Sequence, residues 1–505
     1  MLKLFGGGKA DHPLADPKEA RKILDEIPAE PIKALDELGH WMESVAATEG
    51  FKPEARAQLL LQIDDAAQPP LRRIARDYLG AERLSKFQEG RLWGAMHGYC
   101  QHAAAALSAT VELFASGAKG AEALKSLAPT VTVRALRALS QQVKWQYLRY
   151  GPFDDGLWGR VARVFAIAEA RKFARQAVAA WPGSPESSAE QEFLRAVMMS
   201  ASSPDSLLPT EIELAERLIA HFASSFAMAN AQQGDAAYWI DLAASQPPLR
   251  LARPPQPSPT LRFISAGRAL QEVEDLGRKV KASNAVPSSV PLGASYEPAV
   301  VMEVLDHLLL YWSSTPPERR HPRHRVKSRL AVSHGFDGSL GVLGVSGSLD
   351  FDVGSAESWI VDNVSAGGFG VLVPQIKGEW LKIGCLLAMQ PEGGTNWLLG
   401  VVRRFTRDST QQGSVGVQTV ARAMAGASLR IGGGEAEPGI VLDPQCIEGS
   451  VEARIILKPG SLLPGQNIEF ELNGKQILLL PQGVLEAGDD YEILRCRPML
   501  RDTGE

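Results

Sequence analysis

The sequence predicts a multidomain α+β protein, in which a mostly α-helical N-terminal region is followed by β-rich sequence. From about residue 16 to 250, apolar residues recur at three- and four-residue spacings, which is the periodicity of amphipathic helices. From about residue 318 onward, short apolar runs alternate with glycine turns, as in antiparallel β domains. With 505 residues, the chain is long enough for about three domains of ordinary size.

The helical region is expected to span residues 16–245. Its first helix is indicated by Asp16 as the N-cap, Pro17 in the first turn and Glu19 three residues after the cap. Turn-rich breaks at 151–156 and 181–188 separate longer periodic runs further along. This pattern is typical of helix pairs that pack on each other, either as a bundle or as a repeat-like array. One buried face of the second helix is predicted from the spacing of Ile32, Leu35, Leu38, Met42 and Val45.

Residues 246–315 are expected to form a proline-rich linker with connecting helices, because six prolines occur within residues 245–260. The β-rich remainder divides into a first unit at 316–428 and a second at 439–500. The glycine-rich stretch 431–439 between them is expected to be a flexible joint. Within the second unit, the Asn-Gly pair at 473–474 lies between two apolar runs and predicts a β-hairpin.

The composition excludes several classes of protein. Apolar residues make up 45% and the net charge is −5, so the chain is globular and does not coat nucleic acid, and any anion site must be local. The cysteines are far apart in the sequence, which favours neither a disulfide scaffold nor a zinc site. No apolar segment reaches the roughly 20 residues of a membrane span, and the N-terminal apolar run is too short for a signal peptide. We expect a cytoplasmic protein without a metal or cofactor.

The densest cationic stretch of the chain, ERRHPRHR at 318–325, is the first feature that indicates chemistry. It contains Arg319, Arg320 and Arg323. Guanidinium groups hold phosphate oxygens bidentately and also bond the O6 and N7 acceptors of guanine, so this stretch suits a guanine nucleotide. Taken alone, the stretch is also compatible with a solvated charged linker or with a strip that touches nucleic acid.

The second feature is NVSAGG at 363–368, directly after an apolar run. The amide of Asn363 can bond a base edge, and Ser365 offers a hydroxyl group. Gly367 and Gly368 allow a turn to approach an anion closely. The alternative interpretation is a structural β-turn that uses serine and glycine for tight geometry.

Together, these two features resemble the PilZ domain, the bacterial receptor module for cyclic di-GMP. The family's Arg-x-x-x-Arg motif is matched by Arg319 and Arg323. Its [Asp/Asn]-x-Ser-x-x-Gly motif is matched by Asn363, Ser365 and Gly368. The resemblance covers about residues 316–425.

The resemblance implies an antiparallel β-barrel with cyclic di-GMP on its surface and the arginine arm wrapped over the ligand. In this mode the two motif arginines meet phosphate and guanine edges, and Arg320 is an auxiliary cation. Asn363 would bond guanine, and Ser365 would bond the phosphate. The glycine-rich stretch 334–350 between the motifs is expected to be an enlarged loop.

We therefore expect a cyclic di-GMP effector that binds its ligand and turns nothing over, with a helical region that meets a partner protein. An enzyme is not expected, because the sequence contains no Gly-x-Ser-x-Gly, Walker A, His-Glu-x-x-His or Rossmann glycine motif. Two alternatives remain open. One is a helical scaffold or adaptor with a degenerate PilZ-like domain, and the other is a nucleic-acid-binding regulator that uses the same arginines.

Overall fold

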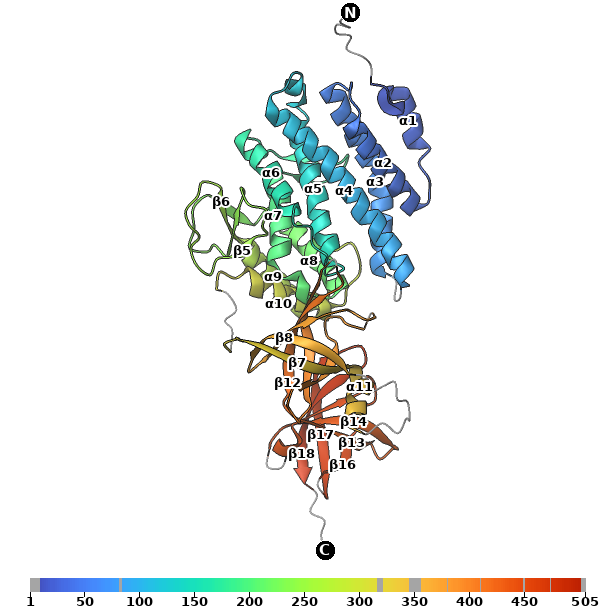
Figure 1. Ribbon diagram of the computed structural model, residues 1–505, viewed down its shortest axis with the longest axis vertical. Coiled ribbons are helices and arrows are strands. Elements are labelled where there is room, and N and C mark those ends of the chain that lie inside the picture. Colours follow the sequence, from blue (N-terminus) through green and yellow to red (C-terminus); the bar gives the residue numbers. More distant parts are fainter. Residues whose placement is uncertain are drawn as a thin grey trace, which may run out of the picture. The chain divides into compact units, whose positions relative to one another are not determined.

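The chain forms two compact units in a computed structural model, which describes residues 10–80, 84–315, 321–344, 356–378, 380–408, 410–447, 450–472 and 474–500 (Figure 1). The first unit comprises Met1–Arg149 and Phe153–Pro317, and the second comprises Tyr150–Pro152 and Glu318–Glu505. Helices dominate the first unit and antiparallel strands the second, which confirms the α+β class predicted from the sequence.

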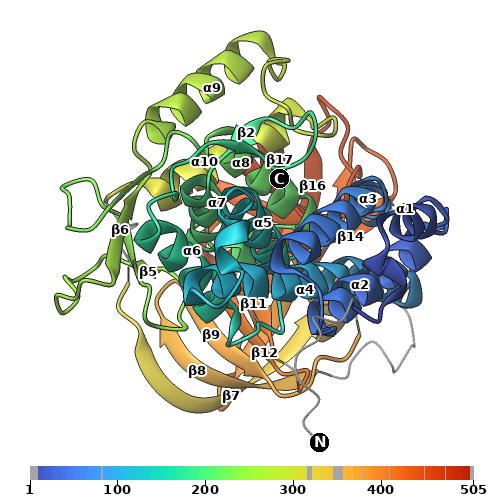
Figure 2. The same ribbon diagram turned by 90° about the horizontal axis from the view of Figure 1, so that it is seen from above.

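The first unit is built around long helices that pack side by side. Helix α4 contacts α2, α3 and α5, and α5 in turn contacts α6 and α7, as the view in Figure 2 shows. No helix within the described ranges is both long enough and apolar enough to cross a membrane. The helices are α1 (Pro17–Asp25), α2 (Pro31–Ala47), α3 (Pro53–Gly80), α4 (Lys86–Ser116), α5 (Ala128–Tyr147), α6 (Leu157–Ala170), α7 (Ala189–Ala201), α8 (Pro209–His221), α9 (Ala269–Ser283) and α10 (Pro298–Trp312).

Helix α1 begins where its sequence predicts, and helix α2 buries the face that its sequence predicts. The Asp16 side chain accepts hydrogen bonds from the backbone N–H groups of Lys18 and Glu19, which confirms the predicted N-cap. Along α2, the predicted stripe faces the interior, since Leu35 and Leu38 are fully buried and Met42 and Val45 follow on the same face. Local periodicity is sufficient here because each helix presents one apolar face to its neighbours.

The proline-rich segment belongs to the first unit and contributes an edge strand. Strand β5 pairs with β4 at the end of the sheet order β3-β6-β4-β5. A two-residue edge strand tolerates the prolines beside it, because its outer N–H groups need no partner strand. The short strands of this unit are β1 (Val178–Ala179), β2 (Glu186–Ser187), β3 (Ala227–Ala229), β4 (Tyr238–Asp241), β5 (Leu249–Arg250) and β6 (Leu261–Ser265).

The second unit contains two closed antiparallel barrels of six strands each, with strand orders β10-β11-β12-β9-β8-β7 and β13-β14-β15-β18-β17-β16. Numbered one to six in chain order, the strands of both rings read 1-2-3-6-5-4, so the two barrels share one topology. The first consists of β7 (His324–His334), β8 (Glu357–Ser365), β9 (Gly368–Val373), β10 (Leu386–Pro391), β11 (Leu398–Arg407) and β12 (Gly413–Ala421). The second consists of β13 (Met424–Ile431), β14 (Ala436–Leu442), β15 (Ala453–Leu457), β16 (Ile468–Leu472), β17 (Lys475–Ala487) and β18 (Glu492–Leu500).

The stretch 334–350 differs from the enlarged loop expected from its glycines. Residues Gly335–Val342 form helix α11, and residues 345–355 lie outside the described part of the chain. Phe336 and Leu340 are four residues apart and only 1% and 2% exposed, so one helical face is buried. The burial of this face against the rest of the fold outweighs the low helix propensity of glycine. Sequence periodicity over only eight residues does not reveal such burial.

The stretch 431–439 is part of the second barrel, where a flexible joint was expected. It contains the turn of the β13–β14 hairpin, in which Arg430 pairs with Ala436. Gly432 and Gly433 supply the positive φ angles of 58° and 77° that this turn requires. The β-hairpin expected in this barrel is confirmed, since Leu472 at the end of β16 pairs with Lys475 at the start of β17.

Candidate ligand-binding site

The hairpin of β8 and β9 carries the NVSAGG motif and forms the frame of the candidate site. Ser365 pairs with Gly368, which leaves Ala366 and Gly367 as a two-residue turn. Gly368 has φ 153°, and a Cβ atom there would collide with the backbone carbonyl oxygen of Val417 on β12. The last position of the motif therefore requires glycine because two strands approach each other closely at this point.

The hydroxyl group of Ser365 closes the turn of this hairpin. Its Oγ accepts a hydrogen bond from the Gly367 N–H and donates one to the Gly368 carbonyl oxygen, both at 3.3 Å. The carbonyl oxygen of Gly367 accepts a hydrogen bond from the Thr419 N–H at 3.0 Å, which ties the turn to β12. Ser365 thus has the local structural role that the β-turn interpretation predicted, and its oxygen keeps a second lone pair for a ligand.

A polar row crosses five strands on the outer face of the first barrel. Its members are directly opposed in register, from Arg325 on β7 through Asn363, Gly370 and Gly416 to Arg404 on β11. Opposed residues on neighbouring strands share a face, and the two glycines add no side chains of their own to the middle of the row. We call these five residues the outer row. An arginine stands at each end of it.

Side chains of the outer row lie over the two glycines. A Cβ atom on Gly370 would come within 2.8 Å of the Asn363 Oδ1, and one on Gly416 within 3.2 Å of the Arg404 Cβ. The Asn363 Nδ2 donates a hydrogen bond of 2.9 Å to the exposed carboxylate of Asp362, which orients the carboxamide. The carboxylate of Asp362 is also a negative charge beside the outer row, so it opposes the binding of a negatively charged ligand.

The predicted site residues fall into three groups. Asn363, Ser365, Gly367 and Gly368 lie together on the β8–β9 hairpin. Arg323 is exposed and comes directly before β7, whose His324 pairs with Val364 on β8, so the chain carrying Arg323 runs alongside the hairpin. The imidazole of His321 lies against the hairpin, 3.2 Å from where a Cβ atom of Gly367 would be. Arg319 and Arg320 lie outside the described residues.

Sequence reasoning missed four members of the outer row: Arg325, Gly370, Gly416 and Arg404. Arg325 belongs to the cationic stretch, and Gly370 follows the NVSAGG motif by two residues. Arg404 and Gly416 occur in GVVRR and GSVGVQ, which are recognisable as strands. The missing information was the register, because Arg404 faces Gly416 across a β-bulge and Asn363 lies 38 residues beyond its partner Arg325. Arg323 and Arg325 are both exposed.

Charged side chains also gather inside the first unit, where they neutralise one another. Burial opposes ionisation of Glu192, yet the positive charges of Arg137 and Arg195 lower its pKa to about 2. Pairing of this kind offsets part of the cost of burying each charged group. Across the described residues, no group of three His, Cys, Asp or Glu side chains is placed to hold a metal ion. The buried pairs are Arg134–Asp64, Arg137–Glu192, Lys144–Glu213 and Arg195–Glu216.

Comparison with known proteins concerns the helical region. Residues 18–232 match the family model described as the N-terminal domain of the cyclic-di-GMP receptor FimW. A search of curated proteins finds no match. The matched segment extends from α1 to just past β3, so it includes neither the first barrel nor the outer row. The helical region of this chain is therefore similar to the N-terminal domain of a cyclic di-GMP receptor.

Proposed function

We propose that the protein is a cyclic di-GMP-binding effector whose ligand lies on the outer face of the first barrel. One observation carries this proposal. The outer row, the glycine hairpin and the exposed Arg323 bring arginines, a carboxamide and a glycine turn together on one surface. The similarity of residues 18–232 to a cyclic di-GMP receptor domain supports the same ligand from a separate part of the chain.

In the proposed mode the arm before β7 closes over the ligand. Arg323, together with Arg319, binds phosphate oxygens and guanine edges, and Arg320 adds positive charge. The Asn363 side chain forms hydrogen bonds with a guanine edge. The Ser365 hydroxyl group forms a hydrogen bond with a phosphate while it also holds the turn. Gly367 and Gly368 allow the ligand to approach the hairpin backbone.

The charges of the outer row suit an extended dianion. Arg325 and Arg404 stand at its two ends, and guanidinium groups pair with phosphate oxygens in bidentate geometry. Asp362 is the opposing charge at the hairpin, and the nearby arginines outnumber it. The expected outcome is net attraction that weakens with added salt.

Calorimetry on the full chain tests the proposal. Cyclic di-GMP is expected to bind with a stoichiometric heat, whereas GTP and a duplex DNA oligonucleotide at the same concentration are not. Arg323→Ala should weaken cyclic di-GMP binding by about 1 to 3 kcal/mol, the scale of one bidentate arginine contact, with an unchanged melting temperature. Arg430→Ala, which removes an exposed arginine of the second barrel, is the matched control.

Two results would contradict this function. Unaltered affinity in a folded Arg323→Ala variant would remove the arm from the site. DNA binding that exceeds cyclic di-GMP binding, and that Arg323→Ala abolishes, would assign the same arginines to nucleic acid.

We further propose that ligand binding alters how the helical region presents itself to a partner protein. Helix α10 ends at Trp312, eleven residues before Arg323, and two prolines in this connection limit how much movement it can absorb. Hydrogen exchange with and without cyclic di-GMP should show protection in residues 316–330 and also in α10. Protection confined to the arm and barrel would leave a ligand-binding domain without a switch.

A further inference from the structure

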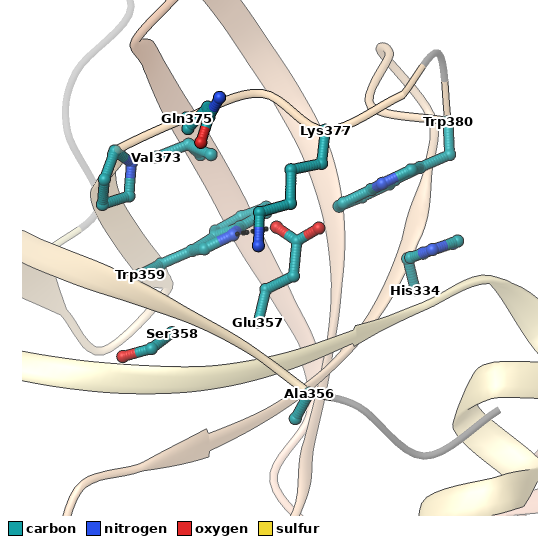
Figure 3. A pocket seen from close by; sticks show the side chains of 10 residues that line it. His334, Ala356, Glu357, Ser358, Trp359, Val373, Gln375, Lys377 and Trp380 are labelled. Carbon is teal, nitrogen blue, oxygen red and sulfur yellow. Dashed lines mark hydrogen bonds between the residues drawn. The ribbon is translucent and has the colours of Figure 1, made fainter. Parts of the chain in front are cut away.

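A cavity of about 550 Å³ opens at one end of the first barrel, away from the outer row (Figure 3). This volume lies within the roughly 300 to 1,000 Å³ of small-molecule sites, and barrel mouths are common places for them. The described residues that line it are His334, Ala356, Glu357, Ser358, Trp359, Val373, Pro374, Gln375, Lys377 and Trp380.

Register places Glu357 and Trp359 on the inner face of the barrel. Glu357 is opposite Val332 and Trp359 is opposite Leu330, and both of these partners are core residues. The Asn363 and Ser365 side chains belong to the other end of β8 and to the outer face. A carboxylate among apolar inner-face residues is uncommon without a partner that uses it.

Aromatic rings form a flat wall of the cavity. The ring centroids of Trp359 and Trp380 are 5.9 Å apart with an interplanar angle of 11°. His334 stacks on Trp380 with centroids 4.0 Å apart and an angle of 6°. Trp359 is only 1% exposed and its ring is part of the barrel core. The partly exposed indole of Trp380 therefore offers the ring surface on which a planar heterocycle can stack.

Two charged groups supply the directional contacts. The Glu357 Oε2 accepts a hydrogen bond of 2.9 Å from the Trp359 Nε1–H, which fixes the carboxylate and leaves its other lone pairs for a ligand. Figure 3 shows this carboxylate between the two indoles and the Lys377 side chain reaching into the same cavity. One anion and one cation balance, so a neutral ring can enter without leaving a net charge in the cavity.

We propose that this cavity binds a planar heterocycle with two adjacent N–H donors, and that a guanine base has the fitting chemistry. The carboxylate of Glu357 accepts the N1–H and the N2 amino group side by side, in the forked geometry that carboxylates also use with arginine. The indole of Trp380 stacks on the ring, and Trp359 holds the carboxylate in place from the core side. This site is separate from the outer row and does not depend on cyclic di-GMP binding there.

Saturation-transfer NMR on the full chain with guanosine, inosine and adenosine tests the proposal, because nucleosides carry no phosphate for the arginines. Guanosine is expected to bind with a dissociation constant below about 1 mM, and adenosine at least about tenfold more weakly, since it lacks the N1–H donor. Inosine, which has N1–H but no N2 amino group, should fall between them.

Two variants and two controls complete the test. Glu357→Gln keeps an acceptor for Trp359 and should weaken guanosine binding at least about tenfold. Trp380→Leu, at a partly exposed position, should weaken the binding of all three nucleosides to the same extent. Glu435→Gln, at an exposed carboxylate in the second barrel, should change nothing, and guanosine binding should persist in Arg323→Ala.

Three results would overturn this site. They are the absence of guanosine binding to the unaltered chain, equal binding of guanosine and adenosine, and unchanged guanosine binding by a folded Glu357→Gln variant. Because Arg323→Ala changes the arm at the cyclic di-GMP site and not the cavity, failure of the cavity and failure of the cyclic di-GMP site are separately visible.

Discussion

The two barrels share one strand order but use the same face in opposite ways. In the first barrel, the outer row runs from Arg325 to Arg404 and is polar and rich in glycine. The row that crosses the corresponding five strands of the second barrel reads Gly426, Ile440, Ile456, Ile493 and Glu486. Its three isoleucines are at most 2% exposed and lie in a cluster with residues of the first barrel and α11.

This difference shows that the topology sets where a face lies, while side chains decide what that face does. An apolar row on a barrel exterior must be covered, and in the second barrel it packs against its neighbour. A row of arginine, asparagine and glycine gains nothing from being covered and stays open to solvent. Only the second kind of surface can recruit a small anion.

The largest effect is expected from making the covered face polar. Ile456→Asn removes a fully buried side chain from the shared cluster and buries an amide there, and should lower the free energy of unfolding by about 4 kcal/mol. Leu372→Asn, on the outer face of the first barrel and 41% exposed, is the control and should stay within about 0.5 kcal/mol. Urea titration of the full chain measures both, and equal effects would refute the contrast between the faces.

The next effect concerns the β8–β9 hairpin of the first barrel. Gly368→Ala places a Cβ atom against the Val417 carbonyl oxygen and should cost about 3 kcal/mol of unfolding free energy, with a loss of cyclic di-GMP affinity. Gly433→Ala, in an open turn of the second barrel at φ 77°, should cost about 1 kcal/mol. A Gly368→Ala variant that melts and binds normally would show that the turn tolerates a side chain.

A smaller effect is expected at the far end of the outer row. Arg404→Ala and Asn363→Ala should each weaken cyclic di-GMP binding by about 2 kcal/mol, because each removes hydrogen bonds to the ligand. Calorimetry on variants with normal melting temperatures measures this, with Arg430→Ala on the second barrel as the control. An effect of Asn363→Ala without an effect of Arg404→Ala would shorten the site to the hairpin end.

The smallest effect has the opposite sign. Asp362→Asn retains an acceptor for the Asn363 amide but removes the negative charge, and should strengthen cyclic di-GMP binding by up to about 1 kcal/mol. The gain should shrink as salt is added, because the charge is exposed. Glu437→Gln, on the second barrel, should leave affinity unchanged. A loss of affinity in Asp362→Asn would mean that orienting the carboxamide matters more than charge.

Local sequence patterns predicted the parts of the fold that depend on local chemistry. The Asp16 cap, the buried face of α2 and the two-residue hairpin before Lys475 each follow from residues a few positions apart. Helix α11 was missed because its stability comes from burying Phe336 and Leu340 against distant strands.

In the candidate site, too, residues that depend on local sequence were predictable and residues that depend on distant strands were not. Asn363, Ser365 and Gly368 were identifiable because their turn is continuous in sequence. Arg404 and Gly416 were not, because their place in the outer row depends on strand register, and a shift of one residue would turn each to the other face. The shared topology of the barrels was also hidden, since the chain shows no repeat of matching residues.

The cluster around α11 has a consequence for how this half of the protein can be divided. Phe336 and Leu340 belong to one buried cluster with Leu399 and Val401 of the first barrel and Ile440 and Ile456 of the second. A protein cut after residue 428 would expose the first barrel's share of that cluster to water, and apolar surface of this kind drives self-association. The two barrels therefore gain their stability as a cooperative pair, and removing one leaves the other prone to aggregate.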